Sequence, residues 1–545
     1  MNMRNKLKMS LFSAQTRLIL LVTAFIMVTG NLSLFHRLLE IYPLSADNWP
    51  FLLSLTAFFT LTTALFFLWV CHGRTGQWLL AIFLVASALA AYYMDQYGIV
   101  IDFVMIDNIV ETNPQELAGL ISASLIVRTL LFGLIPAYLV LRFGPKSRGL
   151  LAELKPKLIL GLCLIVASVL VIAPVTAQFA SFVREHKITR LYQNPLGYTY
   201  ALISYAQHHL QSSKIYALVN VAEDAKEIGA PSHNELVILV VGETARADRF
   251  SLNGYRKETN PELKKQHVVS FRNVTSCGTS TGESVPCMFS VLGRKDFDRE
   301  KASHYKNALD VLFEHGVQII WRDNNSDSKG VATRVSYEDF KSPSLNPVCA
   351  GECRDIGMLS GLDKFIETRK HKDILIVLHQ MGNHGPEYYR RYPKEFARFQ
   401  PMCMSGELNT CTKEEIDNAY DNAILYTDYF LSNVIDLLKK YDDQFATAML
   451  YVSDHGESLG EHGIYLHAAP YVIAPKEQTH IPAILWTGKH FDYDMADIRP
   501  FADHPLSHDD LFCSLMVAYE FKSKTCASKD ALLFKNKDIA NRQTH

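Results

Sequence analysis

Five long apolar runs near the start of the chain most constrain what it can fold into. Each is close to the ~20 residues that a helix needs to cross the hydrocarbon core of a bilayer. The runs cover residues 15–36, 49–71, 78–94, 122–142 and 158–179. Beyond residue 235 the apolar runs shorten to about eight residues at most, the length of a buried strand. We therefore predict a transmembrane domain of five helices over residues 1–180, followed by a globular part.

The first run also has the basic start of a signal peptide, because Arg4, Lys6 and Lys8 precede it. It is long, however, it lacks a small-x-small cleavage site, and four more apolar runs follow it. We interpret it as a retained membrane anchor.

The charges between the runs predict the orientation. If the runs alternate in direction, one side of the membrane receives the basic residues Arg4, Lys6, Lys8, Arg17, Arg74, Arg142, Lys146, Arg148, Lys155 and Lys157. The other side receives Arg37 and a loop that carries Asp95, Asp102, Asp107, Glu111 and Glu116. By the positive-inside rule the N-terminus is cytoplasmic, and an odd number of spans exports everything after about residue 180. Arg128, inside the fourth run, is expected to extend to the outer interface rather than to act as a buried functional arginine.

The number and positions of the cysteines also indicate that the globular part is exported. Cys71 and Cys163 lie in or beside apolar runs and are expected to stay reduced, whereas the other eight all follow residue 270. An even number of cysteines in an oxidising compartment predicts disulfides. Close spacing favours Cys277–Cys287, Cys349–Cys353 and Cys403–Cys411, and elimination leaves Cys513–Cys526. Zinc fingers are the competing interpretation, but the chain has no C-x2-C pair.

Residues 181–230 are expected to connect the two parts. Their amphipathic stretches, Tyr198 to His209 and Ile215 to Ala222, fit either a helix in the headgroup plane or a linker helix packed on the globular domain. The net charge of −2 gives no electrostatic case for binding nucleic acid.

From residue 231 to 545 the sequence alternates strand and helix patterns. Short apolar, β-branched runs occur at 236–241, 317–321, 373–378, 447–452 and 481–486, and helical patterns occur near 303–315, 414–440 and 505–521. This alternation predicts an α/β domain with a mainly parallel sheet and helices on both faces. Ligands of such sheets bind beyond the carboxyl ends of the strands.

Metal-type side chains follow three of these predicted strands. Glu243 follows the first, His379 and His384 follow the run at 373–378, and Asp454 and His455 follow the run at 447–452. One acidic residue after a strand is unremarkable, but three such strand ends meeting at one edge indicate a site. Oxygen and nitrogen donors of this kind suit zinc, and the carboxylates also suit manganese or magnesium.

A loop rich in small hydroxyl residues lies at 275–287, with the sequence TSCGTSTGESVPC. A hydroxyl at the start of a following helix would sit where free N–H groups and the helix dipole favour a phosphate. Such Ser/Thr-Gly loops are usually only turns or caps, but the flanking cysteines indicate a backbone that must hold its shape. A hydroxyl becomes a good nucleophile when a metal ion helps to remove its proton.

These stretches resemble the lipid A phosphoethanolamine transferases, which include the mobile colistin-resistance enzymes and share an alkaline-phosphatase/sulfatase-like domain. The resemblance covers nearly the whole chain. It is carried by VGETARADRFSLNGY from 241, TSCGTSTGESVPCMFS from 275, WRDNNSDSKG from 321, LHQMGNHGP from 378 and SDHGESLGEHGIYLHAAP from 453.

The resemblance implies roles for particular residues. It implies a Zn2+ site, with one ion or two, made by Glu243, Thr281, Asp454 and His455, with Thr281 as the nucleophile. Positions near the substrate are implied for His379, His384, His467, Lys329, Asn108, Thr112 and Glu116. The last three, in the loop between the third and fourth runs, match residues that bind the phosphoethanolamine headgroup; helix caps and interfacial polar groups are the alternative. The chain departs from the family at Gly282-Glu283, where Ala and an apolar residue are expected, and at His462, where Asn is common.

The implied reaction has two steps. The Thr281 hydroxyl attacks the phosphate of the donor phosphatidylethanolamine and releases diacylglycerol, and a phosphate of the acceptor lipid A then takes the phosphoethanolamine from the threonine. The resemblance implies polymyxin resistance through a less negative surface, with His384 and His467 as candidate bases for the second step. Alternatives are transfer to Kdo or core heptose, a phosphoglycerol transferase, or a phosphate-binding receptor without activity. We expect a monomer.

Overall fold

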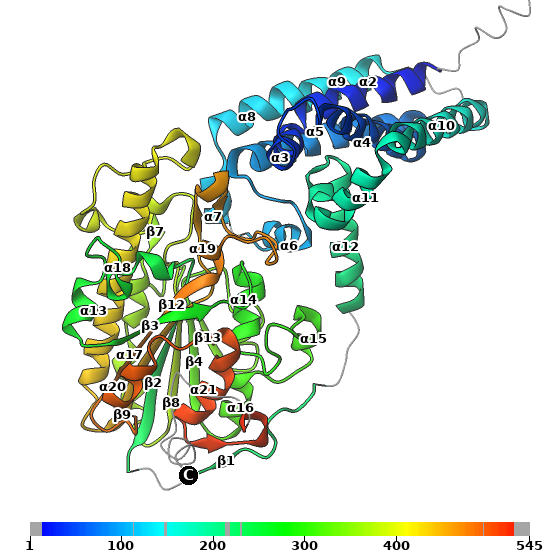
Figure 1. Cartoon of the computed structure of the whole chain (residues 1–545). Coiled ribbons are helices and arrows are strands. Elements are labelled where there is room, and N and C mark those ends of the chain that lie inside the picture. Colours follow the sequence, from blue (N-terminus) through cyan, green and yellow to red (C-terminus); the bar gives the residue numbers. More distant parts are fainter. Residues whose placement is uncertain are drawn as a thin grey trace, which may run out of the picture. The chain divides into compact units, whose positions relative to one another are not determined.

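A computed structural model describes residues 13–112, 114–145, 150–212, 218–228, 232–493 and 495–527 (Figure 1). By its internal contacts the chain divides into two compact units. Unit 1 comprises Met1–Ile106 and Ile121–Gln207, and unit 2 comprises Asp107–Leu120 and His208–His545. The short stretch Asp107–Leu120 therefore belongs to unit 2, although helices of unit 1 precede and follow it in the sequence.

Unit 1 consists of long apolar helices. Among the described residues, four are long and apolar enough to cross a membrane: α4 (Trp49–Val70), α5 (Gly73–Tyr97), the continuous stretch Ala123–Phe143 and the stretch Glu153–Glu185. The first apolar run forms α2 (Ala14–Thr29) and α3 (Leu32–Ile41), which are bent by 58° and provide a fifth span if they cross together. All five predicted runs therefore form helices, as the fold prediction requires.

The third long stretch is not one regular helix. It is made of α8 (Ala123–Thr129), a π-helical turn at Leu130–Leu134 and α9 (Ile135–Phe143). Arg128, near the end of α8, forms an ion pair with Asp95 of α5, and Asp95 also accepts a hydrogen bond from the backbone N–H of Ser33 at 3.0 Å. The arginine inside this run is thus neutralised by a carboxylate of unit 1.

The predicted connector begins within unit 1. It contains α11 (Thr176–Glu185) and α12 (Leu196–Ser212). The backbone N–H of Asn194 donates to Asn31 at 2.8 Å, and the hydroxyl of Tyr198 lies 3.1 Å from that of Ser87. The connector up to α12 is therefore packed on unit 1; the stretch from Ile215 begins outside the described residues.

Unit 2 is built on an eight-stranded sheet with the order β13-β3-β12-β9-β2-β8-β4-β5. The strands are β2 (Asn234–Gly242), β3 (Val269–Thr275), β4 (Gln318–Asp323), β5 (Ser336–Asp339), β8 (Ile374–His379), β9 (Phe445–Ser453), β12 (His480–Thr487) and β13 (Leu506–Ser507). All neighbours pair in parallel except β12, which is antiparallel to both β9 and β3. The mainly parallel sheet is thus confirmed, and its one reversed strand was not predicted.

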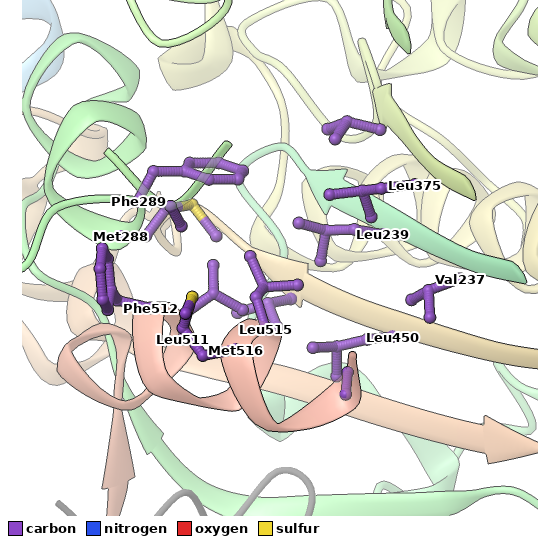
Figure 2. Close-up of a cluster of buried hydrophobic side chains, with 14 of the residues drawn as sticks. Val237, Leu239, Met288, Phe289, Leu375, Leu450, Leu511, Phe512, Leu515 and Met516 are labelled. Atoms are coloured by element: carbon purple, nitrogen blue, oxygen red, sulfur yellow. The ribbon is translucent and has the colours of Figure 1, made fainter. Parts of the chain in front are cut away.

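Helices cover both faces of this sheet (Figure 1). Alternate residues of β2 point to opposite cores: Val237 and Leu239 join one cluster, and Leu236 and Ile238 join the other. The first cluster includes α16 (Ala308–Glu314) and α21 (Leu511–Ala518), as Figure 2 shows for Leu511, Phe512 and Leu515. The second includes α17 (Leu362–Glu367) and α18 (Lys413–Lys439). A strand buried on both faces must be apolar throughout, which explains the unbroken LVILVV run.

The five predicted strands are present, and helix α18 matches the prediction at 414–440. The other two predicted helices are shorter than expected. The region 303–315 contains the end of α15 (Arg299–Ser303) and α16, and 505–521 contains only α21 as an α-helix. In 505–521 the pattern was extended by Leu506, Tyr519 and Phe521, which flank α21 and pack against the same core.

Four disulfides close loops of unit 2. The structure pairs Cys277–Cys287, Cys349–Cys353, Cys403–Cys411 and Cys513–Cys526. Cys71 and Cys163 of unit 1 are unpaired.

In a bacterial strain that cannot form periplasmic disulfides, we expect the full-length protein to be depleted. Each disulfide restricts the unfolded chain and thereby stabilises the folded state by about 2–4 kcal/mol. Immunoblotting of membranes measures this. The matched control is the Cys71→Ser/Cys163→Ser variant in a normal strain, which should accumulate like the wild type. Equal abundance of the wild type in both strains would contradict a stabilising role.

Candidate metal centre and active site

The carboxyl edge of the sheet brings together three metal-type side chains. Glu243 follows β2, and Asp454 and His455 follow β9, the strand paired in parallel with β2. The backbone N–H of Asp454 donates to the carbonyl of Gly242 at 2.9 Å, so the pairing continues past the strand ends. All three side chains are fully buried, and one donor atom from each lies within 4.8 Å of the others.

The Thr281 hydroxyl reaches two of these three residues, Glu243 and His455. Thr281 is the first residue of α14 (Thr281–Met288), and its Oγ1 donates to Glu243 Oε2 at 3.1 Å and lies 3.4 Å from His455 Nε2. The side chain thus lies where the free N–H groups of the helix start favour an anion. The structure therefore places the predicted nucleophile among the predicted ligands.

These residues fit a metal ion. Burial lowers the pKa of His455 well below its usual value, so its imidazole is neutral, the form that binds a metal. His455 Nδ1 is already engaged with the carbonyl of Gly456 at 2.9 Å, which leaves Nε2 as the donor. Asp454 Oδ2 is buried without a hydrogen bond within the described part of the chain. An unsatisfied carboxylate oxygen in a dry site is costly unless a cation compensates it.

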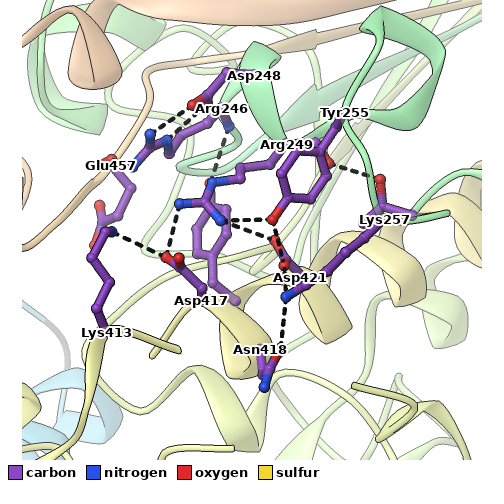
Figure 3. Close-up of polar contacts among 12 residues, drawn as sticks. Arg246, Asp248, Arg249, Tyr255, Lys257, Lys413, Asp417, Asn418, Asp421 and Glu457 are labelled. Atoms are coloured by element: carbon purple, nitrogen blue, oxygen red, sulfur yellow. Dashed lines mark hydrogen bonds and ion pairs between the residues drawn. The ribbon is translucent and has the colours of Figure 1, made fainter. Parts of the chain in front are cut away.

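Two buried arginines fix the loop that carries Glu243 (Figure 3). Arg246 donates to the carbonyl of Glu457 at 3.1 Å and pairs with Glu461 at 2.8 Å. Arg249 pairs with Asp417 of α18 at 2.8 Å. These contacts explain the arginines in the ETARADR motif: they neutralise acidic residues from two other segments and hold the ligand loop against them.

A second group of possible metal donors adjoins the first. It comprises His455, Glu457 and His467. His467 Nδ1 lies 2.8 Å from Glu457 Oε2, and the rings of His467 and His455 are 4.5 Å apart. Because His455 has only Nε2 available, the two groups share one donor atom, and a second ion could not use it independently.

His384 extends this row of histidines. Its ring centroid lies 5.3 Å from that of His467, and burial, together with the neighbouring His467, lowers its pKa well below the usual value. A neutral imidazole can accept a proton, as a general base must. The structure thus places His384 and His467 next to the centre formed by Thr281.

His379 lies in a different environment. Its Nδ1 lies 2.9 Å from Asp323 Oδ2, which also accepts a hydrogen bond from the Trp321 indole at 2.8 Å. All three side chains are fully buried. His379 is the last residue of β8, and its Nε2 is buried without a hydrogen bond within the described part of the chain, so its position near the substrate stays a prediction.

The short stretch Asp107–Leu120 brings charge to the nucleophile loop. Asp107 and Glu111 of α6 (Phe103–Glu111) both pair with Arg299, and Glu111 also pairs with the Lys329 ammonium at 2.8 Å. A Cβ at Gly282 would lie 3.1 Å from Glu111 Oε2. Gly282 therefore allows this carboxylate to approach the residue next to Thr281, which explains the departure from Ala. Burial raises the pKa of Glu111, but Lys329 and Arg299 outweigh burial and hold that pKa below its usual value.

The predicted headgroup residues Asn108 and Thr112 are half-buried on the same stretch. The hydroxyl of Thr112 donates to the carbonyl of Asn108 at 2.7 Å, a bond within the helix. The side chain of Glu116 lies outside the described residues. His462, the second departure from the family, has a left-handed backbone with a φ of 53°, which suits Asn.

Comparisons with known proteins agree with this geometry. A family model described as Sulfatase matches residues 235–519, and one described as Phosphoethanolamine transferase EptA/EptB matches residues 58–210. Phosphatidylethanolamine transferase Mcr-1 of Escherichia coli is 40% identical over 94% of this chain and 96% of its own length. The chain belongs to the phosphoethanolamine transferase family. Phosphoethanolamine transferase EptA of Escherichia coli K12 is 37% identical over 94% of this chain and 96% of its own length.

The fold of this phosphoethanolamine transferase family member matches a relative along its whole length. The integral membrane protein lipooligosaccharide phosphoethanolamine transferase A of Neisseria meningitidis has a TM-score of 0.90 and 32% identity, covering 95% of this chain and 98% of that one. The match therefore includes both the membrane helices and the sulfatase-like domain.

Several residues at the site were not predicted. Asn325 donates to Glu243 Oε2 at 2.6 Å, and His508 accepts from the backbone N–H of Cys277 at 3.0 Å while its Nε2 lies 2.9 Å from the carbonyl of Ser453. His508 thus links the nucleophile loop to the end of β9. His508 follows no predicted strand, so the sequence did not indicate this contact. Asn325 follows the predicted strand at 317–321, so the rule that ligands bind beyond strand ends could have identified it.

Replacing His508 by Ala should lower transferase activity and destabilise unit 2 by about 2–4 kcal/mol, because it leaves two buried backbone groups unsatisfied and a cavity. Thermal unfolding of the purified full-length protein measures the loss. The exposed His504→Ala should behave like the wild type; equal effects at both positions would show that His508 has no special role.

Replacing Glu111 by Gln should lower activity and destabilise the protein by about 1–3 kcal/mol, because the largely buried Lys329 ammonium loses its carboxylate. Adding Lys329→Gln should restore stability without activity. The ion-paired Glu314→Gln, remote from the site and exposed, is the matched control. Unchanged stability in Glu111→Gln would refute the importance of this pair.

Proposed function

We propose that the protein transfers phosphoethanolamine from phosphatidylethanolamine to a phosphate of lipid A, through a covalent phosphoethanolamine–threonine at Thr281. We place it in the bacterial inner membrane with its N-terminus in the cytoplasm and unit 2 in the periplasm. The relatives named for this activity, their identity along the whole chain and the positive-inside charge pattern support this proposal.

One observation carries the mechanism. A single hydroxyl, Thr281 Oγ1, lies at a helix start among two buried carboxylates and a neutral imidazole, 3.1 Å from the nearest carboxylate oxygen. A threonine that only capped a helix would not need these donors. The arrangement supports attack by this hydroxyl on a phosphorus atom.

The donor set suits Zn2+. Glu243, Thr281, Asp454 and His455 would hold it, and it would supply stabilisation of negative charge on the phosphoryl oxygens and on the threonine oxygen.

The protein's own residues carry the bond changes and the proton transfers of the two steps. In the first step the bond from Thr281 Oγ1 to phosphorus forms and the bond to the diacylglycerol oxygen breaks, so the hydroxyl proton ends on the leaving alcohol. In the second step an oxygen of the acceptor phosphate forms a bond to phosphorus, the bond from phosphorus to Thr281 Oγ1 breaks, and Oγ1 takes up the proton that the acceptor phosphate gives up. We assign the movement of these protons to His384 and His467, whose rings adjoin that of His455, and attraction of the phosphate to Lys329.

Transfer changes the charge of the cell surface. Adding ethanolamine to a lipid A phosphate removes negative charge and adds an ammonium, which weakens attraction of cationic peptides. We therefore propose that expression raises resistance to polymyxins.

The test of the function is Thr281→Ala, with Thr281→Ser as its matched control. Mass spectrometry of lipid A from expressing cells should show the added phosphoethanolamine with the wild type, less with Ser and none with Ala, because Ser keeps the hydroxyl and Ala removes it. Both variants should accumulate normally, since little packing is lost. Modified lipid A in cells with Thr281→Ala would disprove the nucleophile.

Metal content tests the ligand set separately. Glu243→Ala, Asp454→Ala and His455→Ala should each lower the zinc bound per purified protein and lose both the lipid A modification and polymyxin resistance. Asp436→Ala, which removes an exposed carboxylate of α18 away from the site, should keep its zinc. Full zinc content in all three ligand variants would exclude this metal centre.

A further inference from the structure

A large cavity lies in unit 2, beside the histidine row but outside the centre formed by Thr281. Its volume is about 1310 Å3, and its walls come from residues 347–356, residues 387–397, two methionines near residue 403 and the aromatic side chains of α18. Small-molecule pockets are typically ~300–1,000 Å3. The cavity is therefore larger than a phosphoethanolamine group needs.

Two of the four disulfides hold the walls of this cavity. Cys349–Cys353 closes the hairpin of β6 (Cys349–Ala350) and β7 (Glu352–Cys353), which lines it. Cys403–Cys411 closes the loop whose Met402 and Met404 also line it. Because a disulfide restricts the motion of its loop, these walls are held in shape.

One wall is aromatic. Phe396 lies 4.9 Å from Tyr426 and 5.0 Å from Tyr429, ring centre to ring centre, and Tyr426 and Tyr429 are stacked at 6.1 Å. Tyr429 is 37% exposed although its ring is large and apolar. Aromatic faces of this kind offer packing to the apolar face of a sugar ring, and the tyrosine hydroxyls offer hydrogen bonds.

The remaining walls carry a small excess of positive charge. Four basic residues line the cavity (Arg354, Arg390, Arg391, Lys394) against three acidic ones (Glu352, Glu387, Glu395), which gives a net charge of +1. Arg391 pairs with Glu352, and Arg390 pairs with Glu387. Arg354 donates to the carbonyl of Arg390 and, within the described ranges, has no carboxylate partner. Its guanidinium is thus available to a phosphate, which it can bind through two hydrogen bonds.

The cavity is joined to the centre by a short series of contacts. The rings of His455, His467 and His384 follow one another at 4.5 and 5.3 Å. The carbonyl of His384 then accepts a hydrogen bond from Arg391 Nε at 2.6 Å, and Arg391 lines the cavity. A ligand in the cavity is therefore separated from the nucleophile by the histidine row alone along this route.

We propose that this cavity binds the phosphorylated sugar headgroup of the acceptor lipid, with Tyr429 packing on a sugar ring and Arg354 holding a phosphate. The assignment rests on the proposed function, because it supplies the acceptor for the second step. The volume exceeds what the donor headgroup needs, and the combination of the exposed Tyr429 ring with the Arg354 guanidinium fits an anionic sugar better than a neutral peptide.

The test separates the two half-reactions of the full-length protein in nanodiscs containing phosphatidylethanolamine. Release of diacylglycerol in the absence of acceptor measures the first half-reaction. Labelled phosphoethanolamine on lipid A measures the second half-reaction. Arg354→Gln and Tyr429→Leu should keep the first unchanged and lower the second about tenfold through a higher KM for lipid A, as loss of one charge-assisted hydrogen bond or one packed ring predicts.

Matched controls lie outside the cavity. Arg369, which lies 3.9 Å over the ring of Phe365, and Tyr337, which is 40% exposed, provide Arg369→Gln and Tyr337→Leu, and both should keep both half-reactions. A parallel fall of the two half-reactions in the cavity variants, or no fall in the second, would overturn the assignment.

Direct binding provides a second measurement. A bisphosphorylated glucosamine disaccharide without acyl chains should bind the wild type in ligand-observed NMR and compete with lipid A, and Arg354→Gln should weaken this binding. Binding that is equal in wild type and variant would also overturn the assignment. If the wild type releases no diacylglycerol, the proposed function fails, and disaccharide binding alone then decides the cavity.

Discussion

The pairing of β2 with β9 sets the geometry on which the candidate site depends. The two strands run in parallel register from Asn234 opposite Phe445 to Gly242 opposite Ser453, and one more hydrogen bond joins Asp454 to Gly242. A slip by one residue would turn every side chain to the other face of the sheet. Because β2 packs into a core on each face, such a slip would require both cores to repack. The same packing that stabilises the sheet therefore fixes the distance between Glu243 and Asp454.

The carboxyl edge of the sheet holds the buried carboxylates of Glu243 and Asp454 away from water. Two carboxylates with no exposed surface repel one another, and the protein meets this cost in different ways at different positions. At Glu243, Asn325 supplies a hydrogen bond and Thr281 supplies another. Around it, Arg246 and Arg249 neutralise neighbouring acids. At Asp454 one oxygen is left for a cation. Stability and function are coupled here, since an ion that binds only the folded state also stabilises it.

Much of this could be predicted from the sequence, and the exceptions have physical reasons. Strands β2, β8 and β9 were recognisable because burial on both faces makes them continuously apolar, and the site followed because parallel strands end at one edge. Strand β3 (Val269–Thr275) was missed because four of its seven residues are exposed or half-exposed polar ones that break the apolar run. The reversal of β12 has no local signal, since direction is set by the loops. The contact of Glu111 with Lys329 joins residues far apart in the chain, and no local pattern in the sequence indicates it.

The assignment of Asp107–Leu120 to unit 2 has a consequence for work on truncated proteins. A soluble fragment beginning at residue 208 keeps Arg299 and Lys329 but loses both carboxylates that neutralise them, Asp107 and Glu111. Arg299 and Lys329 are then without these partners. Because Arg299 lies next to Gly282, small anions from the buffer are attracted to the loop that carries Thr281. Affinities for phosphate or sulfate measured on such a fragment would overstate those of the intact chain, and crystals of it would tend to carry anions where the full-length protein has its own carboxylates.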